Sequence, residues 1–184
     1  MEASSGTGAA IFTGASSIPS APCTVIGCPR TSGPLSAGTT VHALLVFDDG
    51  SGPALYAGGF FSIAGGVPAN NIAKWNGSSW NALGSGMNSA VFALTVFDGG
   101  SGPALYVGGY FTTAGGVAPN CVAKWDGSSW AALGSGMNGT VYALTVFDDG
   151  GGPALYAGGH FATAGGVWVD YNPKGEGSRW AGLS

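Results

Sequence analysis

The order of apolar and polar positions divides the chain into short β-type segments that end at turn signals. Val91–Phe97 is a run of apolar and β-branched residues, which is typical of a strand. The cluster Asp-Gly-Gly-Ser-Gly-Pro at 98–103 then predicts a turn. Three more strands are expected at the following short apolar runs: 104–111, 121–125 and 129–133. No segment shows helical periodicity, so the pattern predicts an all-β protein.

This unit of four strands recurs with a period of about fifty residues. Residues 41–90, 91–140 and 141–184 align without a gap, and the first two copies agree at most positions. Short strands with Gly-rich turns at a fixed period predict the blades of a β-propeller. We therefore expect one domain with three clear blades at those boundaries. Residues 1–40 echo the repeat faintly, and they are interpreted either as a degenerate partial blade or as a loose leader.

The motif order within each copy resembles the kelch repeat. A double glycine ends the second strand, an aromatic residue with Asn or Asp ends the third, and a Trp lies in the fourth. The signature residues are Gly58, Gly59, Trp75, Trp80, Gly108, Gly109, Trp125, Trp130, Gly158, Gly159 and Trp180. The third copy departs from the pattern, because Gly175 replaces its first Trp. More loosely, the repeat sequence is similar to the propeller repeats of bacterial surface proteins and of fungal cortical markers. The resemblance implies a fold and leaves the activity open.

The signature residues have plain physical roles in this interpretation. Glycine pairs let neighbouring backbones approach closely, and they also tolerate φ values that are closed to other residues. The recurring Trp and Phe side chains are expected to fill the space between neighbouring blades, where each can bury about 150–250 Å².

Composition narrows the classes of partner. The chain has 45% hydrophobic residues, 8% charged residues and a net charge of −4. This balance is opposite to that of disordered chains. Nucleic acid is not expected as a partner, because the few Lys and Arg residues are scattered along an acidic chain. No apolar run is long enough to span a membrane.

Two sets of residues are candidates for binding. Asp48, Asp98 and Asp148 place a carboxylate on the same turn of every copy. They are candidates for calcium or a cationic ligand, but Asp at the start of a turn usually caps its own backbone. We therefore expect no metal and no cofactor. The other set varies among near-identical copies, either as a rim that contacts a partner or through drift: Phe60, Tyr110 and His160. The column His42, Phe92 and Tyr142 varies in a similar way.

The cysteines give no metal site. Cys23 and Cys28 are either a local disulfide or two thiols, and they are too few for a Cys₄ zinc site. Cys121 replaces Asn71 of the previous copy, which indicates a simple packing position.

Three classes of function remain open. The favoured one is a non-catalytic binding or scaffold module of an extracellular or surface protein, with an unidentified protein or glycan as ligand. The second is a structural repeat unit that self-assembles, because three blades leave two open faces for association unless residues 1–40 close a small ring or the chain belongs to a longer propeller. The third, a glycan-active enzyme, needs a cluster of carboxylates or a nucleophile with a base, which the sequence lacks.

Overall fold

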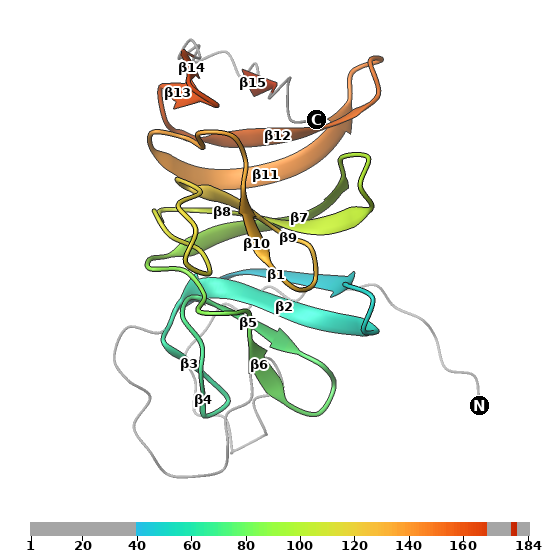
Figure 1. The fold of residues 1–184 in the computed structure, drawn as a ribbon, viewed down its shortest axis with the longest axis vertical. Coiled ribbons are helices and arrows are strands. Elements are labelled where there is room, and N and C mark those ends of the chain that lie inside the picture. The colour runs from blue at the N-terminus through green and yellow to red at the C-terminus, as the bar shows by residue number, and fades with distance from the viewer. Residues whose placement is uncertain (1–39, 169–177, 180–184) are drawn as a thin grey trace, which may run out of the picture.

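The computed structural model describes residues 40–168 and 178–179, which form antiparallel β-sheets (Figure 1). Each repeat contributes one main sheet, none of the sheets closes on itself, and the described residues include no helix. The predicted all-β class is confirmed. The segment predicted as a partial blade or leader, residues 1–40, lies outside the described residues except for Thr40. Cys23, Cys28, Gly175 and Trp180 lie outside them as well.

The main sheets follow the repeat order. Sheet 1 consists of β1 (Thr40–Asp48), β2 (Pro53–Phe60), β5 (Ile72–Trp75) and β6 (Trp80–Ala82). Sheet 2 consists of β7 (Val91–Asp98), β8 (Pro103–Gly109), β9 (Val122–Trp125) and β10 (Trp130–Ala132). Sheet 3 consists of β11 (Thr140–Asp148), β12 (Pro153–His160) and β15 (Ser178–Arg179). Two small hairpins complete the described strands: β3 (Ile63–Ala64) with β4 (Val67–Pro68), and β13 (Thr163–Ala164) with β14 (Val167–Trp168).

The aspartate turns join the first two strands of each sheet. Asp48 Oδ1 accepts hydrogen bonds from the backbone N–H groups of Gly50 and Gly52, both at 2.9 Å. Both glycines have positive φ, at 95° and 102°, which other residues rarely adopt. Asp98 and Asp148 make the same two bonds in their own turns. These carboxylates therefore cap the backbone of the turn they begin.

The first strand of each sheet carries one extra residue. The pairing of β1 with β2 shifts between Val41 and Ala43, and the same shift recurs in the other two sheets. The extra residue is His42 in sheet 1, Phe92 in sheet 2 and Tyr142 in sheet 3. Such a β-bulge bends the strand locally and re-aims a side chain.

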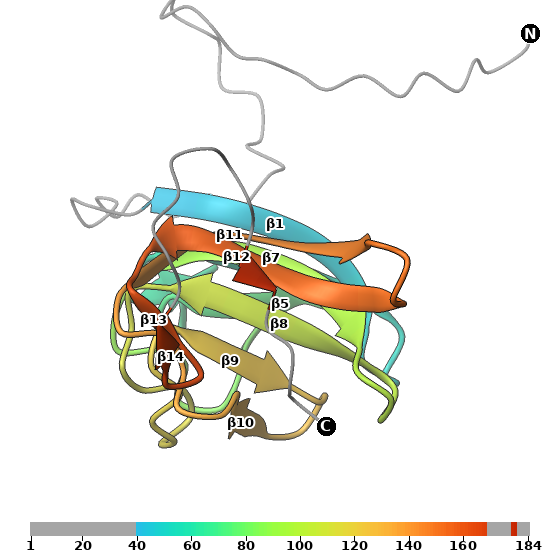
Figure 2. The ribbon, with the colours of Figure 1, turned by 90° about the horizontal axis from the view of Figure 1, so that it is seen from above.

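The three sheets stack face to face, with β1, β7 and β11 side by side (Figures 1 and 2). We call the contact between sheets 1 and 2 the first joint, and that between sheets 2 and 3 the second joint. Tyr56 and Leu83 of repeat 1 pack at the first joint with Leu105 and Trp130 of repeat 2. The second joint buries Tyr106 and Leu133 against Val141 and Leu155. Aromatic side chains thus fill the space between neighbouring sheets, as expected from the sequence.

The paired glycines serve close approach and not unusual φ. None of Gly58, Gly59, Gly108 and Gly109 has a positive φ. A Cβ atom on Gly58 would collide with the side chain of Val91, and one on Gly108 would lie 2.6 Å from Val141 Cγ1. Only glycine at these positions lets the next sheet dock, so one of the two roles expected from the sequence is absent.

Candidate functional site

The variable column at the end of the second strands is exposed. Tyr110 follows β8, and Phe60 and His160 end β2 and β12. Phe60 is 54% exposed, Tyr110 is 63% exposed, and His160 is also exposed. All three lie at the same end of their sheets, because the strands are equivalent. The structure therefore presents large rings to solvent at the positions that vary between repeats.

The bulged residues form a second row of rings at the same end. The ring centroids of His42 and Phe92 are 5.0 Å apart, and those of Phe92 and Tyr142 are 5.5 Å apart. The rings are tilted relative to one another, as favourable aromatic pairs usually are. Thr40 pairs with Phe60, which places this row near the exposed column. We call the six side chains the aromatic rim: His42, Phe60, Phe92, Tyr110, Tyr142 and His160.

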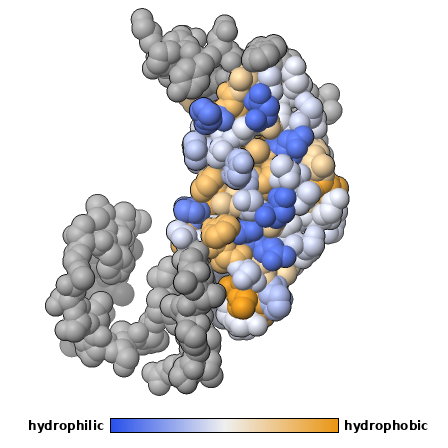
Figure 3. All heavy atoms as spheres, turned by 90° about the vertical axis from the view of Figure 1, so that its left-hand side faces the viewer, coloured by the Kyte–Doolittle hydropathy of each residue, from blue (hydrophilic) through white to orange (hydrophobic). Residues whose placement is uncertain are grey.

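A groove of about 680 Å³ opens beside Tyr110 and is lined mainly by residues of repeat 2. Asn88, Asn120, Asn138 and Thr163 are among the residues that line it, and none of its lining residues is charged. Figure 3 views this end of the molecule and shows polar and apolar side chains interspersed along the stack. Pockets of this volume are typical of small-ligand sites. The neutral lining favours an uncharged polar ligand.

Two asparagines from the linkers fix the walls of the groove. Asn88 Oδ1 accepts hydrogen bonds from the N–H groups of Thr112 (2.9 Å) and Thr113 (3.1 Å) in the next repeat. Asn138 Oδ1 accepts in the same way from Ala162 and Thr163, at 2.8 and 2.9 Å. This role of the two asparagines was not expected from the sequence. The signal was the asparagine that follows the same Met in both copies.

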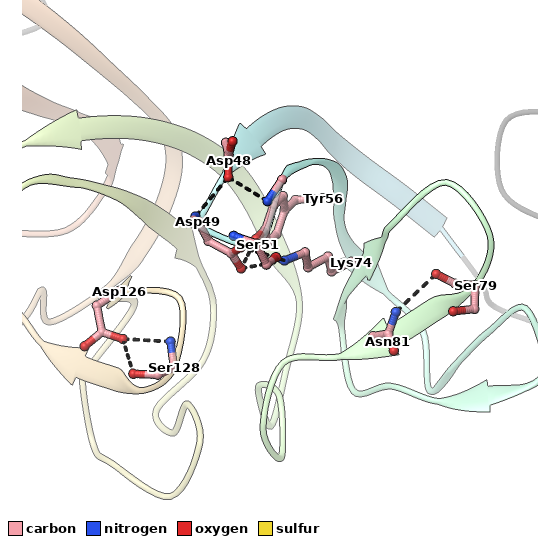
Figure 4. A network of polar contacts seen from close by, with 11 residues as sticks. Asp48, Asp49, Ser51, Tyr56, Lys74, Ser79, Asn81, Asp126 and Ser128 are labelled. Atoms are coloured by element: carbon pink, nitrogen blue, oxygen red, sulfur yellow. Dashed lines mark hydrogen bonds and ion pairs between the residues drawn. The ribbon is translucent and has the colours of Figure 1, made fainter.

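The second aspartate of the first turn has a different environment from the first. Asp49 Oδ2 pairs with Lys74 Nζ at 2.6 Å, and Tyr56 donates its hydroxyl proton to the same carboxylate at 2.7 Å (Figure 4). Burial alone would raise the pKa of Asp49, but the hydrogen bonds from Lys74, Ser51 and Tyr56 outweigh it and hold the pKa well below its usual value. Burial and the bond to Asp49 raise the pKa of Tyr56. This charged cluster stabilises the turn in its ionised state.

Repeat 2 lacks that cluster. Gly99 stands at the position of Asp49, and Lys124 Nζ hydrogen-bonds to Ser101 Oγ at 2.8 Å. In repeat 3, Tyr156 donates to Asp149 at 3.1 Å. The carboxylates of these turns are thus engaged within their own repeat.

Asp126 is engaged in a similar local way. Its carboxylate accepts from the N–H groups of Ser128 and Ser129, both at 2.8 Å, in the hairpin between β9 and β10. These backbone bonds lower the pKa of Asp126. The aspartates that bond to serine hydroxyls, Asp49 and Asp126, lie at the opposite end of the sheets from His42 and His160. No histidine among the described residues is therefore placed to act as a base for these serines.

Cys121 is buried in the core at the second joint, as expected of a packing position, and its backbone conformation adds a requirement that the sequence did not indicate. Cys121 has a φ of 66°, and Asn71 has a φ of 64° in repeat 1. Asn71 Oδ1 accepts from Phe61 N–H (3.1 Å), and its Nδ2 donates to Met87 O (2.8 Å). A thiol cannot reproduce both bonds. Burial raises the pKa of Cys121, and the thiol remains a buried free cysteine.

Comparisons of the chain with models of protein families, with curated proteins and with solved structures found no match. Within residues 40–168 and 178–179, no group of three or more His, Cys, Asp or Glu side chains is arranged to hold a metal ion. The same residues contain no helix of the length and hydropathy needed to cross a bilayer.

Proposed function

We propose that the protein is a non-catalytic binding or scaffold module whose sheets are blades of a kelch-like β-propeller. Three observations support the interpretation of the sheets as blades. They are the repeated sequence, the four antiparallel strands in each of the first two sheets and the face-to-face stacking. In this proposal the module belongs to an extracellular or surface protein, and residues 1–40 stay open between a degenerate partial blade and a leader.

The aromatic rim is the observation that carries a binding role. Phe60, Tyr110 and Tyr142 each expose more than half of their surface, and the neutral groove lies beside Tyr110. Exposed rings next to uncharged amide and hydroxyl groups suit a protein loop or a neutral glycan. We propose no catalytic role, because the described acids are engaged within their own turns.

Binding to printed arrays tests the proposal. The labelled full chain is applied to an array of neutral and acidic oligosaccharides and to an array of extracellular-domain peptides. Tyr110→Ala and Tyr142→Ala are expected to reduce the signal at least tenfold, with the melting temperature unchanged. Phe147→Ala is the matched control, because Phe147 is equally exposed, at 59%, at the other end of its strand. No signal from the wild-type chain, or equal loss in the control, overturns the proposal.

A second candidate, a structural unit that self-assembles, is favoured by a separate observation. The outer faces of the stack retain exposed apolar side chains, including Leu44, Val46 and Phe147. A large exposed apolar face commonly marks an interaction site.

A further inference from the structure

The two joints inside the molecule use the same contacts. Val91 and Leu94 of sheet 2 lie over Gly58 of sheet 1. Fifty residues later, Val141 and Leu144 of sheet 3 lie over Gly108 of sheet 2. In each joint, one sheet supplies a Val–Leu pair as a plug, and the sheet before it supplies a glycine socket.

The first joint also has two contacts further out along the sheets. A Cβ atom on Gly127, in the outer hairpin of sheet 2, would lie 2.8 Å from the backbone oxygen of Asp49. The indole N–H of Trp130 donates to Leu83 O at 2.9 Å. A joint therefore involves the plug, the outer hairpin and the Trp of one sheet.

The first face of sheet 1 carries these same groups without their partners. Leu44 is 46% exposed, whereas Leu94 and Leu144 are half-buried. Val41 is half-buried, whereas Val91 and Val141 are fully buried. Among the described residues, no atom lies within 4 Å of the Cβ position of Gly77, which corresponds to Gly127. Trp80, which corresponds to Trp130, is itself buried, but its indole N–H has no hydrogen-bond partner among the described residues. The Val–Leu plug and the hairpin glycine of this face thus lack the contacts that their counterparts make at the two joints.

The last face of sheet 3 carries an unfilled socket. Gly158 is exposed, whereas Gly58 and Gly108 are buried. Within the described part of the chain, a Cβ atom added to Gly158 would meet only Ala143 Cβ of its own sheet, at 3.8 Å. Phe147 is 59% exposed, whereas Phe47 at the same position in sheet 1 is 7% exposed. Sheet 3 therefore ends in the surface that sheets 1 and 2 offer to their neighbours.

We infer that a second copy of the chain docks head to tail, with Val41 and Leu44 of one copy over Gly158 of the other. The new joint repeats the plug contact of the two internal joints, because Val41, Leu44 and Gly158 are the counterparts of residues that already meet inside the molecule. At the first joint, the hairpin glycine that lies against Asp49 follows Asp126, so two acidic residues are close together. At the new joint, the corresponding hairpin is Asn76–Gly77, which is neutral, and it faces the turn of Asp149. The new contact therefore brings less negative charge together than the first joint does. Plug and socket lie on opposite faces, so the contact is heterologous and produces rings or open stacks.

Two single variants separate the two faces. Gly158→Val places a side chain in the socket without a close contact inside the chain, and the φ of Gly158 is not positive. The single chain is therefore expected to fold and melt like the wild type. Leu44→Lys places a charge on the plug. Light scattering after size exclusion is expected to give a mass that rises with concentration for the wild type, and a constant 18.0 kDa for either variant. Gly108→Val is the matched internal control, and it is expected to lower the melting temperature because Val141 occupies that space.

Mixing the two variants gives the decisive measurement. Leu44→Lys keeps its socket and Gly158→Val keeps its plug, so the mixture is expected to form a dimer and nothing larger. A wild-type chain that stays monomeric at all concentrations overturns the proposal. So does association that survives in Gly158→Val, or a mixture that stays monomeric.

Discussion

Repeats 1 and 2 have nearly the same sequence, yet their environments differ. Leu105 is fully buried because sheet 1 covers it, whereas Leu55 at the same position is half-buried. Conversely, Asp49 of repeat 1 has three side-chain partners, whereas Gly99 of repeat 2 has no carboxylate to offer. The contribution of a residue to the free energy of unfolding thus depends on the neighbouring sheet as much as on the residue itself.

The largest test of this comparison is truncation of the equivalent leucines. Leu105→Ala is expected to lower the free energy of unfolding by about 3 kcal/mol, because it leaves a cavity in the first joint. Leu55→Ala is expected to cost about 1 kcal/mol, since water already reaches that side chain. Urea melts at low protein concentration measure both values. Equal losses would show that the two faces are equally covered in solution.

The tryptophan pair tests the hydrogen bond across the joint. Trp130→Phe removes the donor to Leu83 O and leaves a carbonyl without its partner, which is expected to cost about 2 kcal/mol. Trp80→Phe removes an indole N–H that is buried without a partner, so its cost is expected to stay below about 1 kcal/mol. Thermal and urea melts of the two variants compare the costs. A larger loss in Trp80→Phe would contradict the inferred role of the bond.

The charged turn of repeat 1 predicts an acid-sensitive contribution to stability. The pKa of Asp49 is lower in the folded chain than in the unfolded chain, so its contribution is complete above about pH 4 and is lost as the pH falls through the folded-state pKa. Asp49→Asn is expected to cost about 2 kcal/mol at pH 7 and less at pH 2. Urea melts from pH 2 to pH 7 measure the difference. A cost that does not change with pH would exclude the ion pair as its source.

Repeat 1 also indicates which substitution at Cys121 is expected to stabilise repeat 2. Asparagine adopts the left-handed φ of this position more readily than cysteine does, and it can accept from Phe111 N–H and donate to Met137 O as Asn71 does in repeat 1. Cys121→Asn is therefore expected to stabilise the chain by about 1 kcal/mol. Cys121→Ser is the control, because serine lacks the reach for both bonds. A neutral or destabilising Cys121→Asn would show that the two sites differ.

The smallest expected effect comes from completing the charged cluster in repeat 2. Gly99 does not have a positive φ, and a Cβ atom there would lie 3.4 Å from the Tyr106 hydroxyl oxygen. Gly99→Asp is expected to pair with Lys124 and to add about 0.5 kcal/mol. Gly99→Asn keeps the shape without the charge, so a gain of the same size in both variants would argue against the ion pair.

Periodicity and turn chemistry predicted most of the local structure. The four strands of the complete sheets and the capping by Asp48 followed from the spacing of Gly, Asp and apolar residues. The stacking of His42, Phe92 and Tyr142 did not, because a β-bulge is a property of pairing between strands and leaves little trace in one strand's sequence. The burial of Cys121 followed from its place in the repeat, but its positive φ did not.

The linker asparagines have a consequence for how the chain can change its length. Asn88 belongs to repeat 1 by sequence, but its bonds hold the loop after β8 in repeat 2. Asn138 does the same for the loop after β12, so repeats 2 and 3 are each held by a residue that lies before them in the chain. If one full period is deleted or duplicated, each linker asparagine still precedes a loop to which it can hydrogen-bond. This holds wherever the period begins between Asn88 and Asn138. A loss of any other length separates an asparagine from its loop, so whole periods are the natural unit in which this stack lengthens or shortens.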